Sequence, residues 1–179
     1  MLQKGGKCNM NNKKLAKDYI VDALLQLLKK QKYEDITITD IANKAGVTRI
    51  TFYRNFSSKD EIIKSYLDNL TDEYIKTSKI LYNPNDFKGY IVKLFTHLEK
   101  NKDIGILLYK ANIIYFLKDE FDRIFLAKAK NHKEEYHYAF ISGGLYNLYY
   151  YWIKNNCKET PQELADMFED FYILKGNSN

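Results

Sequence analysis

Apolar side chains recur along this chain with the period of a helix. Between residues 13 and 31 they return every three or four positions, with lysines and aspartates between them. The same spacing is found over residues 58–82, 86–101, 104–116, 117–130 and 134–155, and again from 161 onward. No stretch alternates apolar and polar residues in a way that favours a strand over these helices. The pattern therefore predicts an all-α protein.

Residues 37 to 56, with the sequence TITDIANKAGVTRITFYRNF, predict two short helices around a tight turn. Thr37 and Asp40 have the spacing of a capping box, so the first helix is expected to begin at Ile38. Gly46 can adopt the left-handed backbone conformation that ends a helix, and Thr48 is a suitable cap for the next one.

The second of these helices is expected to have one buried and one outward face. Phe52 and Phe56 are predicted to lie in the core. The side chains predicted to face outward are Arg49, Ile50, Thr51 and Tyr53. A cation, hydroxyl groups and an apolar side chain on one exposed face are typical of a helix-turn-helix that reads DNA.

The charge of +5 is unevenly distributed. Residues 1–64 hold 13 Lys and Arg against 7 Asp and Glu, whereas residues 65–179 hold 15 against 16. A lysine-rich surface that only kept the protein soluble would not concentrate the excess in one third of the chain. The positive part contains the predicted helix-turn-helix, which favours double-stranded DNA as its partner.

Residues 13–65 resemble the DNA-binding domain of the TetR family of bacterial transcriptional regulators. The motifs that carry the resemblance are Ile41-Ala42, Ala45-Gly46-Val47, Thr48, Thr51-Phe52-Tyr53, Phe56 and Ser58-Lys59-Asp60. The sequence departs from the family pattern at Ile50 and Lys32, where glycine is common, and at Asn55, where histidine is common. None of these departures removes a core residue, although Ile50 and Asn55 alter the expected DNA face.

The resemblance implies a dimeric repressor that a small ligand releases from a palindromic operator. It divides the chain into a flexible tail over residues 1–12, a helix-turn-helix domain over 13–57, and a helical regulatory and dimerisation domain over 58–179. The helix that begins near Ser58 is expected to join the two domains and to carry movement to the DNA-binding one.

The expected DNA contacts are of two kinds. Arg49 is predicted to pair with guanine and Ile50 to touch a thymine methyl, with Thr39 as a weaker candidate for the same groove. Phosphate contacts are implied for Tyr53 and for Lys59, which lies at a helix N-terminus, with Thr37, Thr51 and Asn55 in support. The full predicted set is Thr37, Thr39, Thr48, Arg49, Ile50, Thr51, Tyr53, Asn55 and Lys59.

Small residues recur four apart in the predicted helix over 134–155, where they allow another backbone to approach closely. Either packing within the chain or a homodimer interface explains this spacing, and the resemblance favours the dimer. The residues expected at the interface are Ala139, Phe140, Gly143, Asn147, Trp152, Leu164, Phe168 and Phe171.

A small apolar or aromatic effector is expected in the region 87–148. Aromatic stripes are more often core than ligand site, so polar residues inside apolar stretches are the better candidates. The residues predicted to bind the ligand are His97, Tyr109, Asn112, Tyr115, Phe116 and Asn147. A pocketless core would instead favour a DNA-binding regulator that is controlled by a protein partner.

No motif indicates an enzyme, a metal site or a bound cofactor. His132 and His137 are five apart, which is not a metal-binding spacing on a helix. Two cysteines in different parts of the chain fit a reducing cytoplasm. The longest stretch without a formal charge, 136–153, is too polar and too short to span a membrane. A small-molecule carrier or an enzyme is the remote alternative.

Overall fold

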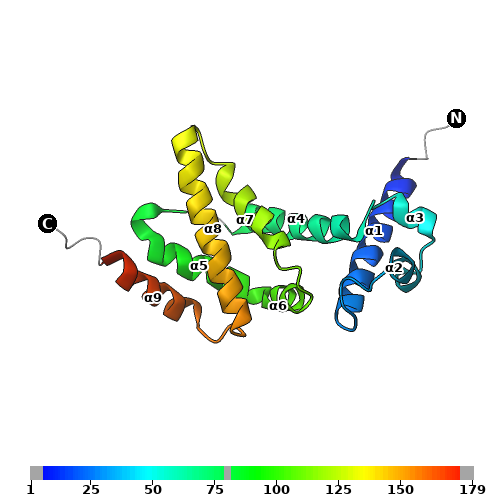
Figure 1. The fold of residues 1–179 in the computed structure, drawn as a ribbon. Coiled ribbons are helices and arrows are strands. Elements are labelled where there is room, and N and C mark those ends of the chain that lie inside the picture. The colour runs from blue at the N-terminus through cyan, green and yellow to red at the C-terminus, as the bar shows by residue number, and fades with distance from the viewer. Residues whose placement is uncertain (1–5, 79–81, 174–179) are drawn as a thin grey trace.

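A computed structural model describes residues 6–78 and 82–173, and in these residues the chain forms helices and no strands (Figure 1). The all-α prediction is confirmed. The elements are α1 (Gly6–Leu28), α2 (Ile38–Ala45), α3 (Arg49–Tyr53), α4 (Lys59–Thr77), the 3-10 helix η1 (Pro84–Asp86), α5 (Phe87–Lys100), α6 (Lys102–Lys110), α7 (Phe116–Leu126), α8 (His132–Lys154) and α9 (Pro161–Ile173).

The first three helices form an N-terminal unit, α1 to α3, around a shared apolar core. Ile20 and Leu24 of α1, Ile41 of α2 and Phe52 of α3 are fully buried in it. The predicted capping box begins α2, and Gly46 ends it with a φ of 67°. This turn places α3 on the outside of the unit. Helices α2 and α3, with the turn between them, form the predicted helix-turn-helix.

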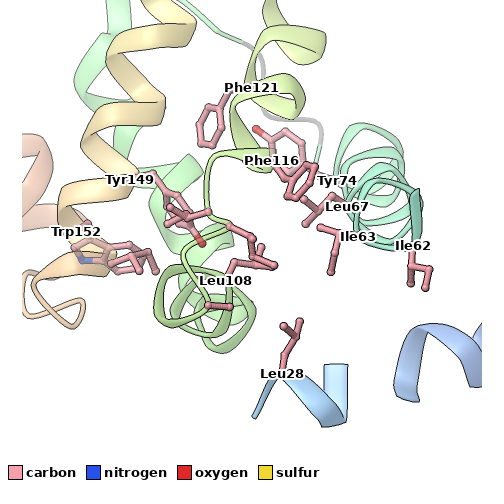
Figure 2. Packing of buried hydrophobic residues seen from close by; sticks show 14 of the residues in the cluster. Leu28, Ile62, Ile63, Leu67, Tyr74, Leu108, Phe116, Phe121, Tyr149 and Trp152 are labelled. Carbon is pink, nitrogen blue, oxygen red and sulfur yellow. The ribbon is translucent and has the colours of Figure 1, made fainter. Parts of the chain in front are cut away.

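Helix α4 runs from the N-terminal unit into the remaining helices and belongs to the core of both (Figure 1). Its first turns bury Ile62 and Ile63, and its later turns bury Leu67 and Tyr74 (Figure 2). The helix ends at Thr77, so the prediction that it continues toward residue 82 is too long. Residues 79–81 lie outside the described part of the chain.

The C-terminal unit, α5 to α9, is built from helix pairs. Helix α8 packs against α7 and α6, α9 packs against α5, and α4 lies against α7. Trp152 of α8 is buried with its ring 5.4 Å from that of Phe95. At Gly105 of α6, an added Cβ would lie 2.1 Å from the hydroxyl of Tyr149, so only glycine permits this close approach of α6 to α8.

Other predicted boundaries also differ from the structure. Helix α1 begins at Gly6 and so includes part of the predicted flexible tail. The helix predicted over residues 104–116 ends at Lys110 instead, because Asn112 adopts a φ of 58°. Asparagine tolerates this left-handed conformation, and the N–H of Ile113 closes the turn on the carbonyl of Leu108. The apolar pattern continued across the turn because both sides of it are buried.

Candidate functional site

Helix α3 presents an exposed face at the outer edge of the N-terminal unit. Arg49 is exposed, and Ile50 and Tyr53 are 67% and 51% exposed. Phe52, on the opposite face, is fully buried and anchors α3 to the core. Such exposure of a large isoleucine and a tyrosine beside a cation is suited to a surface that contacts another molecule. The predicted outward orientation of these three side chains agrees with the structure.

The threonines near this face begin the two helices. The Thr37 hydroxyl accepts from the N–H of Asp40 at 3.1 Å, and hydrogen bonds from Thr37 hold the pKa of Asp40 below its ordinary value. The Thr48 hydroxyl likewise accepts from the N–H of Thr51 at 3.1 Å and lies 3.0 Å from the Thr51 hydroxyl. Thr39 is exposed on the first turn of α2. These hydroxyls fix the start of each helix at the exposed face.

Asn55 lies differently from its predicted position. Its side-chain N–H donates to the carbonyl of Thr51 at 2.7 Å, and its carbonyl oxygen is buried. The amide therefore closes the end of α3 instead of pointing outward. Asn55 thus caps the end of α3 in this structure, and its support of a phosphate contact stays a prediction.

Lys59 also points inward. Its ammonium donates to the carbonyls of Tyr33, Glu34 and Ile36, the last at 3.0 Å, and lies 4.4 Å from the centre of the Tyr33 ring. The Tyr33 hydroxyl in turn donates to the carboxylate of Asp60. All three N–H donors of the ammonium are thus used within the chain, and the phosphate contact of Lys59 stays a prediction. We call these three residues, Tyr33, Lys59 and Asp60, the α4 junction.

Two cations near the exposed face were missed by the sequence analysis. Lys44 is exposed in the last turn of α2, and Arg54 is exposed at the residue that follows α3. Both belong to the positive third of the chain, which was the signal for them. Neither residue belongs to the TetR-like motifs of residues 41–60, so neither was predicted to contact DNA.

A cavity of about 80 Å³ lies in the C-terminal unit, beside α4. Figure 2 shows Tyr74, Phe121 and Tyr149, which line it from three different helices. Its lining residues are Leu67, Leu70, Thr71, Tyr74, Leu94, His97, Leu98, Asn101, Ile104, Leu117, Glu120, Phe121, Ile124 and Tyr149. The ring of the predicted ligand residue His97 lies 4.6 Å from that of Tyr74.

The other five predicted ligand residues do not line the cavity. Asn112 is exposed because it forms the turn after α6, and Asn147 is exposed on α8. Tyr115 is 55% exposed and stacks on Phe116, which is buried in the core. Tyr109 is half-buried against a tyrosine of α8. A polar residue within an apolar stretch was therefore a poor guide to the cavity.

An ion-pair network joins the cavity wall to α4. Arg123 of α7 donates to the Glu120 carboxylate at 2.9 Å, to Asp72 of α4 at 2.8 Å, and to the backbone carbonyl of Asp68 at 3.1 Å. Glu120 is buried and lines the cavity. Its i,i+3 spacing from Arg123 was visible in the sequence, but nothing there placed Asp72 beside them.

Part of the predicted dimer surface is exposed on α8. Phe140 is 76% exposed, Ala139 and Asn147 are also exposed, and an added Cβ at Gly143 would meet no atom within 4 Å. Tyr136 and Tyr151, at 69% and 57% exposure, extend the same face along the helix. We call this set the α8 face, made of Tyr136, Ala139, Phe140, Gly143, Asn147 and Tyr151.

Two predicted interface residues are instead part of the core of one chain. Trp152 is buried, and its indole N–H donates to the carbonyl of Glu159 at 2.8 Å. Leu164 is buried where α9 packs against α5. Both were predicted from a pattern that packing within the chain also explains. The side chains of Phe168 and Phe171 lie outside the described part of the structure.

Among the described residues, no group of His, Cys, Asp and Glu is arranged to hold a metal ion. Over the same residues, no helix combines the length and the apolar character that crossing a membrane requires.

The sequence matches known regulators in both halves. Residues 20–66 match the family of bacterial regulatory proteins described as the tetR family, and residues 85–173 match a transcriptional regulator C-terminal region. Two uncharacterised HTH-type transcriptional regulators of Bacillus subtilis, YxbF and YvdT, are 27% and 29% identical over 83% and 59% of this chain. The chain spans only 42% and 57% of their lengths.

Solved structures share the fold. A TetR transcriptional regulator from Streptococcus agalactiae aligns with a TM-score of 0.63 and 22% identity over 90% of this chain and 95% of its own. The dihydroxyacetone kinase operon activator DhaS aligns with a TM-score of 0.55 and 16% identity over 89% of this chain and 95% of its own. The chain therefore belongs to the TetR family of bacterial regulatory proteins.

Proposed function

We propose that the protein is a homodimeric repressor that a small ligand releases from a palindromic operator. The observation that carries this proposal is that one helix, α4, both lines the cavity and holds the N-terminal unit through the α4 junction. A ligand in the cavity thus acts on the same rigid element that orients α3. Each of the three parts, DNA reading, dimerisation and ligand response, has its own support.

Base reading is assigned to the outer face of α3. The Arg49 guanidinium can donate two hydrogen bonds to the edge of a guanine, and the exposed Ile50 can contact a thymine methyl. Thr39 lies on the neighbouring helix start and serves the same groove. Phosphate contacts, which position the protein without specifying sequence, are assigned to Tyr53 and to the capped helix starts at Thr37, Thr48 and Thr51.

Dimerisation is assigned to the α8 face. Large apolar side chains that are exposed together on one helix mark an interaction surface, and a two-fold dimer buries the same face of both chains. In sedimentation at micromolar concentration, the wild type should be a dimer and Phe140→Glu a monomer. The control is Thr96→Glu, which adds the same charge at an exposed site on α5. A wild-type monomer, or a dimer that tolerates Phe140→Glu, contradicts the assignment.

The ligand response is assigned to the cavity. Its volume of about 80 Å³ is below the roughly 300–1,000 Å³ of ordinary ligand sites, so a ligand has to move its walls apart. Leu67, Leu70 and Tyr74 of α4 form one of these walls. Because Lys59 holds three carbonyls of the α1–α2 connection, a tilt of α4 reaches the DNA-binding face. Coupling of this kind is worth about 1–3 kcal/mol.

The test of the ligand response compares operator binding with and without a compound found by thermal-shift screening. The compound should weaken operator binding several-fold or more. Leu98→Trp fills the cavity and should abolish this effect while operator affinity without ligand is kept. The matched control is Ile75→Trp, at a residue of α4 that is 52% exposed and outside the lining. A response that survives in Leu98→Trp rules out the cavity, and a compound that binds without weakening the operator complex rules out the coupling.

A further inference from the structure

The cavity has a single carboxylate in a mostly apolar and aromatic wall. Among its lining residues, Glu120 is the one Asp, Glu, Lys or Arg side chain, and burial lowers the pKa of the neighbouring lining residue His97. Most of the remaining lining consists of leucine, isoleucine and aromatic side chains. A carboxylate is costly in such surroundings unless charged or hydrogen-bonding groups compensate it.

Arg123 compensates this carboxylate only in part. Both of its hydrogen bonds to Glu120, at 2.9 and 3.2 Å, reach the same oxygen, Oε2. Among the described residues, no side chain or backbone N–H or O–H donates to the other oxygen, Oε1. The same guanidinium also serves Asp72 at 2.8 Å and lies 3.8 Å from the Asp68 carboxylate. Arg123 is thus shared among three carboxylates. Lys76 also acts on Asp72, and Glu120 is the one of the three that lines the cavity.

Other charged groups near the cavity supply no second ion pair to Glu120 among the described residues. Lys100 and Glu73 both act on the His97 ring, and their effects on its pKa oppose each other. Lys118 is paired with Asp122 at 2.6 Å. The rings of Tyr74, Phe121 and Tyr149 line the cavity and offer π faces, which attract cations.

We propose that the effector is an organic cation, a primary or secondary ammonium group on a small apolar body. The ammonium donates to Oε1 of Glu120, and the apolar body lies among the leucines, isoleucines and aromatic rings of the cavity. This inference rests on the proposed function, because it names the ligand class of the same cavity. A carboxylate ligand is repelled by Glu120, and a neutral alcohol forms the hydrogen bond without the charge attraction.

The test titrates the full chain by calorimetry with n-hexylammonium chloride, 1-hexanol and sodium hexanoate, which share one hydrocarbon chain and differ in charge. The ammonium should bind about tenfold or more tightly than the alcohol, since hydrogen bonds between charged groups are stronger than neutral ones. Hexanoate should bind most weakly. Glu120→Gln keeps an acceptor for Arg123 and should reduce the ratio of ammonium to alcohol affinity to about one. Asp119→Asn, an exposed carboxylate on the same helix that does not line the cavity, should keep the full ratio.

The outcomes separate this inference from the proposed function. Equal or tighter binding of the alcohol or of hexanoate overturns the cationic class but leaves the cavity as a ligand site. A preference for ammonium that survives in Glu120→Gln also overturns it. Binding of none of the three probes overturns both the class and the cavity. If the ammonium binds with the predicted preference but operator affinity is unchanged, the ligand class stands and ligand-induced release from DNA fails.

Discussion

Replacing Lys59 by methionine distinguishes two roles for this residue. The TetR-like motif implies a phosphate contact, whereas the structure has its ammonium bonded to the carbonyls of Tyr33, Glu34 and Ile36. Methionine keeps most of the apolar stem and removes the charge and all three donors. The variant therefore measures the α4 junction with little change in packing.

The cost follows from the lost interactions. Hydrogen bonds to charged groups are worth about 1.5–3 kcal/mol each when their loss leaves a buried partner, and the contact with the Tyr33 ring adds about 0.5–1 kcal/mol. Lys59 is half-buried, so water can hydrogen-bond to part of the carbonyls that lose the ammonium in the variant. This reduces the loss of stability. We expect Lys59→Met to lower the free energy of unfolding by about 2–3 kcal/mol, which corresponds to a melting temperature about 4–12 °C lower.

Urea unfolding and operator binding over a salt series provide the assay. Lys59→Met should be destabilised, but the slope of log affinity against log salt should match the wild type. Lys30→Met removes an exposed lysine just after α1 and should change neither the stability nor the slope measurably. If Lys59→Met is as stable as the wild type and its salt slope falls by about one unit per subunit, Lys59 contacts a phosphate and the structural reasoning is refuted.

Three further substitutions test other parts of the account. Arg49→Ala should cost about 1–3 kcal/mol on the operator and relax preference at one base pair, as measured by anisotropy on specific and scrambled duplexes; equal losses on both would assign Arg49 to phosphate. Gly46→Ala should cost about 1 kcal/mol in urea unfolding, because its φ is 67° and no atom lies within 4 Å of an added Cβ. Arg123→Met leaves Glu120 unpaired beside the cavity and should lower the free energy of unfolding by about 1–3 kcal/mol in urea; an unchanged value would indicate that water hydrates the carboxylate.

Local signals in the sequence predicted the helix-turn-helix well. The capping box of Thr37 and Asp40 begins α2, and Gly46 ends it in the left-handed backbone conformation. Both signals can be read from a few neighbouring residues. Burial of Phe52 followed from the helical period. Such features depend on residues within a few positions of each other, and the structure agrees with them.

Contacts between distant residues were not predictable in the same way. Lys59 meets carbonyls more than twenty positions earlier in the chain, and Arg123 meets Asp72 across two helices. The period of α8 could not assign Trp152 to the core of its own chain or to a partner, because both burials give the same pattern. Asn112 was predicted inside a helix because the apolar run on both sides of its turn is continuous.

Binding-site selection from random duplex DNA, with the wild type and Arg49→Ala in parallel, tests the central claim most directly. The wild type should enrich a two-fold symmetric sequence whose half-sites are separated by about one helical turn or a multiple of it. Arg49→Ala should enrich the same symmetric site with preference lost at one position in each half. Enrichment of no sequence, of a sequence without symmetry, or of an identical site by both proteins would contradict the claim that a dimer reads DNA with the outer face of α3.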